Sequence, residues 1–445
     1  MFRSVDPYHQ MVWAELPEDT HDQVGKKIHK AAEKRFDRTE LVPHFIRLAS
    51  ILRKEKSRLA LLLTKEMGKP ISQSEAEIEK CAWLCEYYAE QAPVFLAPRI
   101  VETDASKSYV LYEPYGVWLA IMPWNFPFWQ VFRCAVPAIL AGNKFLLKHA
   151  SNVQQSALAI QSLFEEAGIQ DGIFQVLHIK GKDVANIIAH PAVNGISLTG
   201  SLQAGSHAAS LAAKNIKPQV LELGGSNAFI VTENADIDKA VNDAIIGRFQ
   251  NNGQSCIAAK RILLDRIIEK EFTEKFVAKV QSLKVGAPFD PTVYVGPLVS
   301  KDAAEELYHQ VEQSISEGAQ VLIGHELKGA LYYPTVLTNV TQEMHCMQAE
   351  LFGPVVPIFI YDHWEEAVAV SNSTAFGLGV SIYVKDPESI ADQIARFDEG
   401  AVFINSIVKS DPRLPFGGVK TSGIGRELSI EGIHSFCRIK TVYIA

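Results

Sequence analysis

The chain has 445 residues, of which 47% are apolar, and this is more than one small core needs, so we expect two or three domains. A net charge of −8 without a basic block argues against nucleic acid or an anionic membrane as a partner. The six cysteines form no Cys-x-x-Cys pair, so we expect neither a metal site nor a disulfide framework. The N-terminus is unlike a secretory signal and no apolar run approaches ~20 residues, which favours a soluble cytoplasmic protein without a membrane span.

Apolar residues at helical spacing predict two long helices over residues 20–68 and a third over about 72–91. Two β-rich segments follow at 108–112 and 116–121, and they predict a hairpin or a pair of linked strands. Such an apolar segment in mid-chain needs cover, and we expect another subunit to supply it.

From residue 121 onward, strands and helices alternate, which predicts a mainly parallel sheet with helices on both faces. A second series of the same kind covers 236–430, and the tail 438–444 reads as one more strand. Ligands in such folds bind at the carboxyl ends of the strands. The strands expected in the first series are 144–148, 174–178, 193–199, 220–223 and 229–231.

Polar side chains follow several of these strands. Asn125 lies in the segment Pro123-Trp124-Asn125-Phe126-Pro127, where a strand is followed by a helix. It is either a turn residue or a residue whose amide stabilises an oxyanion. Lys148 ends the next strand, where it either holds an anionic ligand or is a solvated strand end. Gly200 and Ser201 follow a third strand, and small residues there let a phosphate approach a helix N-terminus.

Two further residues suggest acid–base and nucleophilic chemistry. Glu222 lies at an apolar strand end before two glycines, and a buried carboxylate there is either a general base or half of a structural ion pair. Cys256 follows a polar, turn-prone stretch that begins at Gln250. That setting suits an exposed thiol, although a small core residue is the alternative.

Seven motifs, in this order along the chain, resemble those of the aldehyde dehydrogenase superfamily. The sequence is most similar to the short bacterial succinate-semialdehyde dehydrogenases at residues 147–150, 250–251 and 423–429. The seven motifs are 123–127, Lys148, 199–201, 221–225, 253–256, 350–354 and 415–423.

The resemblance implies an α/β, aldehyde dehydrogenase-like fold in three parts. A Rossmann-type domain that binds NAD(P) is expected at 1–95 and 115–224, and an α/β catalytic domain at 225–430. A small β domain at 96–114 and 431–445 is expected to build a homodimer or homotetramer.

The resemblance also implies a mechanism. Cys256 would attack the aldehyde carbonyl to give a thiohemiacetal, with Asn125 and the Cys256 backbone N–H stabilising the oxyanion. Hydride would pass to the nicotinamide and leave a thioester, which water activated by Glu222 would hydrolyse.

For the cofactor, the resemblance assigns Lys148 to the adenosine ribose and Glu350 to the nicotinamide ribose. Many relatives that prefer NAD carry a glutamate at the position of Ser151, and a neutral hydroxyl there does not repel a 2′-phosphate. We therefore expect NADP to be accepted alongside NAD, and the preference between the two is left open. The remaining cofactor contacts are Trp124, Gly200, Ser201 and Phe352.

For the substrate, the resemblance implies that Arg133 binds a distal carboxylate with help from Ser410, which favours succinate semialdehyde. The alternative for Arg133 is a surface helix cation. Gln250 stands where some relatives carry a second arginine, which weakens this assignment. Glutarate semialdehyde, an uncharged aldehyde, transfer of the acyl group to coenzyme A, and a catalytically silent binding protein remain alternatives.

Overall fold

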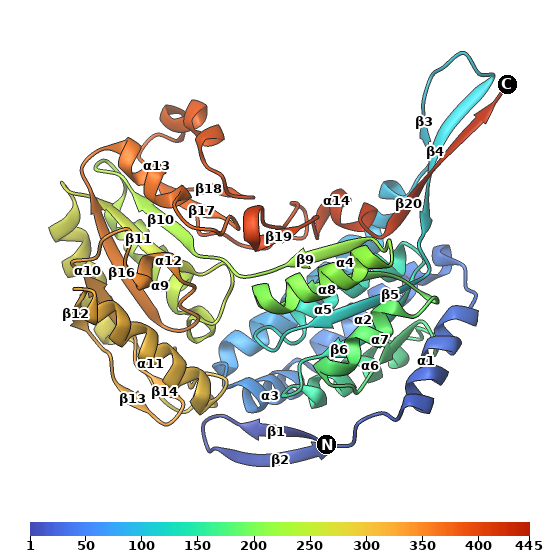
Figure 1. Ribbon diagram of the computed structural model, residues 1–445, viewed down its shortest axis with the longest axis horizontal. Helices are drawn as coiled ribbons and strands as arrows, with labels where there is room; N and C mark the ends of the chain where they lie inside the picture. The colour runs from blue at the N-terminus through green and yellow to red at the C-terminus, as the bar shows by residue number, and fades with distance from the viewer.

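Two sheets and a projecting three-stranded arm organise the chain, which the computed structural model describes over residues 1–445 (Figure 1). The first sheet has six strands in the order β19-β9-β8-β5-β6-β7, parallel except for β19. Its strands are β5 (Val117–Met122), β6 (Lys144–His149), β7 (Phe174–Val176), β8 (Val193–Thr199), β9 (Gln219–Glu222) and β19 (Gly423–Ile424).

Helices cover both faces of this sheet because its strands are apolar on both sides. In β5, Trp118 and Ala120 belong to one core cluster, whereas Val117 and Leu119 belong to another, as the period of two in a strand requires. The first cluster is covered by α2 (Val42–Lys54), α3 (Lys56–Met67), α4 (Ile71–Phe95), α5 (Trp129–Leu140) and α6 (Gln154–Glu166). The second is covered by α1 (His21–Glu33), α7 (Val184–Ala189) and α8 (Leu202–Lys214). The predicted α/β class is thereby confirmed.

The second sheet has seven strands in the order β12-β15-β16-β11-β10-β17-β18, parallel except for β12. They are β10 (Asn227–Val231), β11 (Ala259–Asp265), β12 (Gln320–Ile323), β15 (Thr335–Thr338), β16 (Val355–Tyr361), β17 (Val380–Tyr383) and β18 (Val402–Ile404). Its helices are α9 (Ile237–Phe249), α10 (Glu269–Ser282), α11 (Lys301–Ser316), α12 (His345–Gln348) and α13 (Trp364–Asn372). Each sheet forms its own lobe, and β9 leads from one lobe towards the other (Figure 1).

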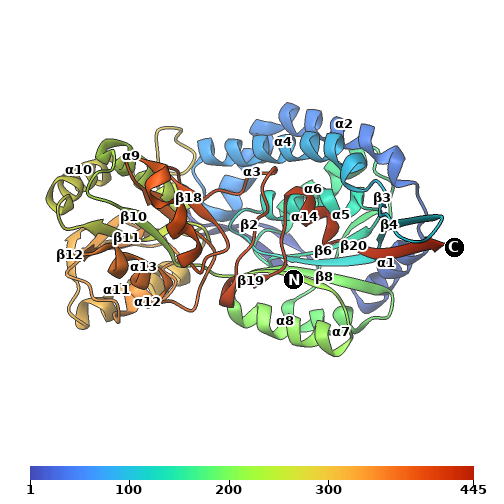
Figure 2. The ribbon, with the colours of Figure 1, turned by 90° about the horizontal axis from the view of Figure 1, so that it is seen from above.

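The arm consists of β3 (Arg99–Ile100), β4 (Lys107–Pro114) and β20 (Cys437–Ile444) in an antiparallel sheet. Figures 1 and 2 both show it extending away from the lobes, with the C-terminus near its tip. Apolar side chains on it remain uncovered, and Ile439 is 70% exposed.

One expectation about the N-terminal half is wrong, and another, which left two alternatives open, is now decided. Residues 20–68 form three helices rather than two, since Pro43 starts α2 and the chain kinks at Glu55 before α3. The segments near 108–112 and 116–121 are not a hairpin but linked strands in different sheets, because β4 pairs with β20 whereas β5 pairs with β6 and β8. The hairpin of β1 (Phe2–Asp6) and β2 (Met11–Leu16) was not predicted. No helix of the chain is apolar over a length that could cross a bilayer.

A buried carboxylate fixes the start of α5, immediately after Asn125. Glu77 of α4 accepts hydrogen bonds from the backbone N–H groups of Phe128 and Trp129, each at 2.9 Å. Its other oxygen pairs with the buried Lys69 ammonium. The carboxylate thereby satisfies N–H groups that a helix N-terminus leaves free.

We expect Glu77→Ala to lower the free energy of unfolding by ~3–5 kcal/mol, because it leaves the Lys69 charge buried without a partner. Urea denaturation followed by circular dichroism measures this. The matched control is Glu79→Ala on the same helix, whose ion pair with Arg53 is solvent-exposed and worth about 0–1 kcal/mol. Equal losses for the two variants would contradict the structural role of Glu77.

Candidate active site

A left-handed turn presents Cys256. Asn251, Asn252 and Gly253 have φ angles of 55°, 57° and 74°, a region that asparagine and glycine tolerate best. The Asn251 side chain donates to the carbonyl oxygens of Asn125 at 2.7 Å and Gln254 at 2.9 Å. The loop before Cys256 is therefore held to the Asn125 segment by buried amide hydrogen bonds.

Cys256 is half-buried, whereas the other five cysteines are buried. It lines two pockets, and Gln130 is the one other residue that lines both. Burial raises the pKa of Cys256 to about 11, although the nearby Lys260 and Arg133 charges act to lower it. The resting thiol is therefore neutral near pH 7 and must lose a proton before it attacks a carbonyl.

Hydrogen-bond donors converge beside the thiol. The Asn125 side chain is buried and donates one amide hydrogen to the Gln254 carbonyl oxygen at 3.1 Å, which leaves its second N–H for a ligand. The backbone N–H of Cys256 donates to no other group. Buried His149 steadies this segment through Nε2, which lies 3.0 Å from the Pro127 carbonyl oxygen. The geometry suits the stabilisation of an oxyanion on a carbon bonded to Cys256.

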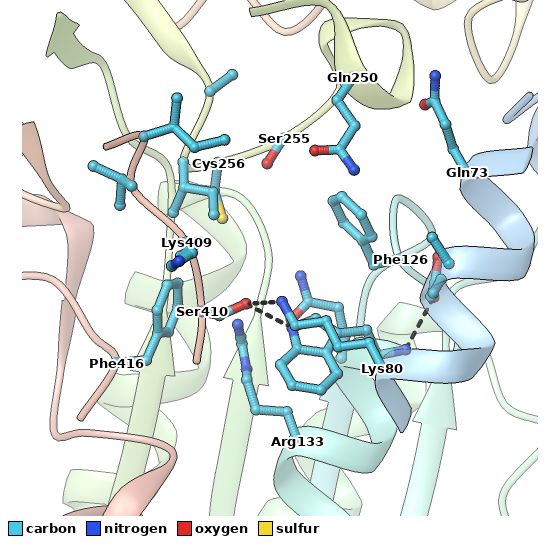
Figure 3. A pocket seen from close by; sticks show the side chains of 18 of the residues that line it. Gln73, Lys80, Phe126, Arg133, Gln250, Ser255, Cys256, Lys409, Ser410 and Phe416 are labelled. Atoms are coloured by element: carbon cyan, nitrogen blue, oxygen red, sulfur yellow. Dashed lines mark hydrogen bonds between the residues drawn. The ribbon is translucent and has the colours of Figure 1, made fainter. Parts of the chain in front are cut away.

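The first pocket has a volume of about 180 Å³ and lies between α4, α5 and the segments 250–258 and 407–416 (Figure 3). Arg133, Gln250 and Ser410, which were expected to meet the substrate, all line it. This volume is below the ~300–1,000 Å³ of sites for drug-sized ligands, so the pocket suits a small molecule.

Arg133 is buried, so the alternative of a surface helix cation is wrong. Its guanidinium pairs with the buried Glu427 carboxylate and lies over the Phe416 ring, 4.6 Å from the ring centroid. The Nη2 atom has no hydrogen-bond partner. Arg133 therefore lines the pocket with its charge paired and with Nη2 free to donate.

The second pocket, of about 310 Å³, lies at the carboxyl ends of β5, β8 and β9. Ser201 caps α8 there by accepting from the Ala204 N–H at 3.3 Å. A Cβ at Gly224 would come within 2.3 Å of Glu350 Oε2, so a larger residue there would displace the Glu350 carboxylate. The predicted cofactor residues that line this pocket are Trp124, Gly200, Ser201, Glu350 and Phe352.

Lys148 and Ser151 lie outside the lining of both pockets. Lys148 is the penultimate residue of β6, at the same edge of the sheet. It is 8% exposed and forms no hydrogen bond or ion pair through its ammonium. Burial lowers its pKa, so a polar or anionic ligand at this point would stabilise the charged form. Ser151 is exposed just beyond it. This edge of the sheet therefore suits a phosphate-bearing dinucleotide, because it presents a free cation, a helix N-terminus and a glycine-lined pocket.

Glu222 is buried at the end of β9 and lines neither pocket. Neither carboxylate oxygen has a hydrogen-bond partner. Burial raises its pKa well above the usual value; Arg133 opposes the shift and Glu427 adds to it. Burial likewise raises the pKa of Glu427, and the Arg133 guanidinium opposes the shift of both carboxyl groups.

Several residues at the site carry no sequence signal. Lys80 of α4 and Gln130 of α5 line the first pocket, but a lone lysine or glutamine in a helix usually reads as solvated. Lys260 donates to Glu350 Oε1 at 2.8 Å and to the carbonyl oxygen of Cys256 at 2.8 Å, and it thereby links the two predicted residues.

The profile described as “Aldehyde dehydrogenase family” matches residues 1–442. A probable NADP(+) succinate-semialdehyde dehydrogenase from Synechocystis is 49% identical over 400 residues, which cover 89% of this chain and 88% of that protein. An NAD(P)+ succinate semialdehyde dehydrogenase from Escherichia coli is 44% identical over 399 residues, 89% of this chain and 86% of that protein. The crystal structure of succinic semialdehyde dehydrogenase from Streptococcus pyogenes with NADP+ superposes with a TM-score of 0.97 at 34% identity and full coverage of both chains.

We expect iodoacetamide to alkylate Cys256 alone, because the other thiols are buried. The rate should rise about tenfold per pH unit between pH 7 and 9, since the thiol has a pKa of about 11 and only the thiolate reacts. Peptide mass spectrometry identifies the site and the time course gives the rate. A rate that is flat over this pH range would contradict the raised pKa.

Proposed function

This chain belongs to the aldehyde dehydrogenase family, and from that premise we propose that it oxidises succinate semialdehyde to succinate with NADP as the hydride acceptor. The observation that carries the proposal is the thiol of Cys256 at the junction of two pockets. One pocket presents cations suited to a carboxylate, and the other lies at strand ends suited to a dinucleotide.

In the first step, Cys256 Sγ bonds to the aldehyde carbon and the carbonyl oxygen becomes an oxyanion. The free Asn125 amide hydrogen and the Cys256 backbone N–H stabilise that charge, and each such donor is worth about 10²–10³ in rate. The thiol proton passes to solvent water in the pocket as the bond forms, because burial holds the pKa of Cys256 near 11.

Trp124, Ser201, Glu350 and Phe352 would hold the nicotinamide dinucleotide in the second pocket, with Lys148 beyond it. When bound, NAD(P) supplies the acceptor for the hydride that leaves the former aldehyde carbon. Lys260 positions Glu350 by a hydrogen bond of 2.8 Å and keeps its carboxylate at the pocket wall. Ser151 places no negative charge near Lys148, which supports the use of NADP.

Glu222 would then activate water for hydrolysis of the thioester on Cys256. Its carboxylate lines neither pocket, so its side chain must turn towards Cys256 to do this. A general base acts in its deprotonated form. Because burial raises the pKa of Glu222, hydrolysis should speed up as pH rises. The presence of this base favours hydrolysis over transfer of the acyl group to coenzyme A.

We further propose a homodimer or homotetramer in the cytoplasm. The uncovered apolar residues of β3 and β20, among them Ile100 and Ile439, support assembly through the arm. Six free cysteines support a reducing compartment. We also propose three domains, in keeping with an arm that stands apart from the two lobes. They are a cofactor domain (1–95, 115–224), a catalytic domain (225–430) and an oligomerisation domain (96–114, 431–445).

The proposal is tested by kcat/KM for succinate semialdehyde, glutarate semialdehyde and butanal, each with NADP and with NAD. We expect the highest value for succinate semialdehyde with NADP, since the pocket is small and carries cations. A higher value for butanal, which has the same chain length without a carboxylate, would contradict a carboxylate-bearing substrate.

We expect Glu222→Gln to lower steady-state kcat by about 10²–10⁴, because the thioester then lacks its base. A burst of one NADPH per active site should remain, because the proposed acylation step uses Cys256 and Asn125 and not Glu222. Stopped-flow absorbance resolves the two phases. Loss of the burst together with kcat would mean that Glu222 acts before the thioester forms.

We expect Ser151→Glu to raise KM for NADP by about tenfold and to leave KM for NAD nearly unchanged, because a carboxylate there repels the 2′-phosphate. Initial rates at saturating aldehyde measure both constants. The control is Ser151→Gln, which has a similar size and no charge. An unchanged KM for NADP in Ser151→Glu would remove the case for NADP.

A further inference from the structure

Three polar side chains meet at one wall of the first pocket. Lys80 Nζ donates to Ser410 Oγ at 2.7 Å and lies 4.1 Å from the centroid of the Trp129 ring, which it overlies. Figure 3 shows the Lys80 and Arg133 side chains both extending towards Ser410. Two cations and a hydroxyl therefore share this wall.

No carboxylate neutralises Lys80. The nearby Glu77 carboxylate is taken up by Lys69 and by the two N–H groups at the start of α5. Asp411 pairs with Arg413 at 2.7 Å, and Glu427 pairs with Arg133. Burial and then the charge of Arg133 lower the pKa of Lys80 to about 8, so an anion between the two cations would stabilise the protonated lysine.

Hydrogen-bond donors at this wall are in surplus. Of the three hydrogens on Lys80, one goes to Ser410. Ser410 Oγ accepts from Lys80 and from Trp129 Nε1 at 3.0 Å, and its own hydrogen is donated to no group. Arg133 Nη2 is also without a partner. A carboxylate has two oxygens that accept such donors, and charge-assisted hydrogen bonds are the stronger ones.

We propose that Lys80 is a substrate-binding residue that selects short aldehydes carrying a distal carboxylate, together with Ser410 and Arg133. This inference rests on the proposed function and deepens it. Lys80 supplies a positive charge without an ion-pair partner beside Ser410, because Arg133 is already paired with Glu427. Gln250 contributes only an uncharged amide, and Lys409, which also lines the pocket, is exposed. Aldehydes without the carboxylate would gain nothing from the ammonium.

The test measures kcat/KM for succinate semialdehyde and for butanal at saturating NADP in a set of variants. Lys80→Gln and Lys80→Met remove the charge, whereas Lys80→Arg keeps it. We expect the ratio of the two kcat/KM values to fall about 10–100-fold in the first two and less than about threefold in Lys80→Arg. The matched control is Lys65→Met, which removes a lysine that lies 4.3 Å from the Trp13 ring centroid, outside either pocket.

A second measurement uses the wild-type enzyme and does not depend on how the variants fold. Succinate should protect Lys80 from acetic anhydride, while Lys65 should be labelled equally with and without it, as read by peptide mass spectrometry. An unchanged ratio in Lys80→Gln, equal losses for both aldehydes, or labelling of Lys80 that succinate does not slow would overturn the role of Lys80. A wild-type enzyme that does not prefer succinate semialdehyde over butanal would instead overturn the proposed function itself, and the inference with it.

Discussion

The hydrogen bonds between the turn before Cys256 and the Asn125 segment are the constraint on which the site depends. Asn251 bridges the carbonyl oxygens of Asn125 and Gln254, and the Asn125 amide in turn donates to Gln254. These groups are buried, so each unmade bond would leave a desolvated polar atom, which costs about 1–3 kcal/mol. The thiol and the oxyanion donors are consequently fixed relative to each other before any ligand arrives.

Burial and nearby charges set the protonation of the nucleophile and of the groups around it. Near Cys256, burial disfavours the thiolate, and Lys260 and Arg133 partly offset it. Deeper in the protein, burial raises the pKa of both Glu222 and Glu427, and the charge of Arg133 opposes both shifts. The resting nucleophile is therefore a neutral thiol, and Lys80 and Lys148 are cations without carboxylate partners.

Much of this arrangement was predictable from sequence because its signals are local. Strand and helix periodicity gave the two α/β series, and motifs placed Cys256, Asn125 and Glu350 at pocket walls. The structure brought Arg133, Gln250 and Ser410 into one pocket, and the assigned roles remain for the variants to test. Lys80 could not be predicted, since its role depends on α4 crossing α5 beside the 407–416 segment. The partnership of Arg133 with Glu427, far apart in sequence, carried no local signal either.

The central claim is that the two pockets meet at an acyl-forming Cys256. The most direct measurement mixes Glu222→Gln with succinate semialdehyde and NADP, quenches in acid, and maps the peptides by mass spectrometry. We expect a succinyl group on the peptide that contains Cys256, and none when NADP is omitted. Turnover without any acylated Cys256, or acylation at another residue, would contradict it.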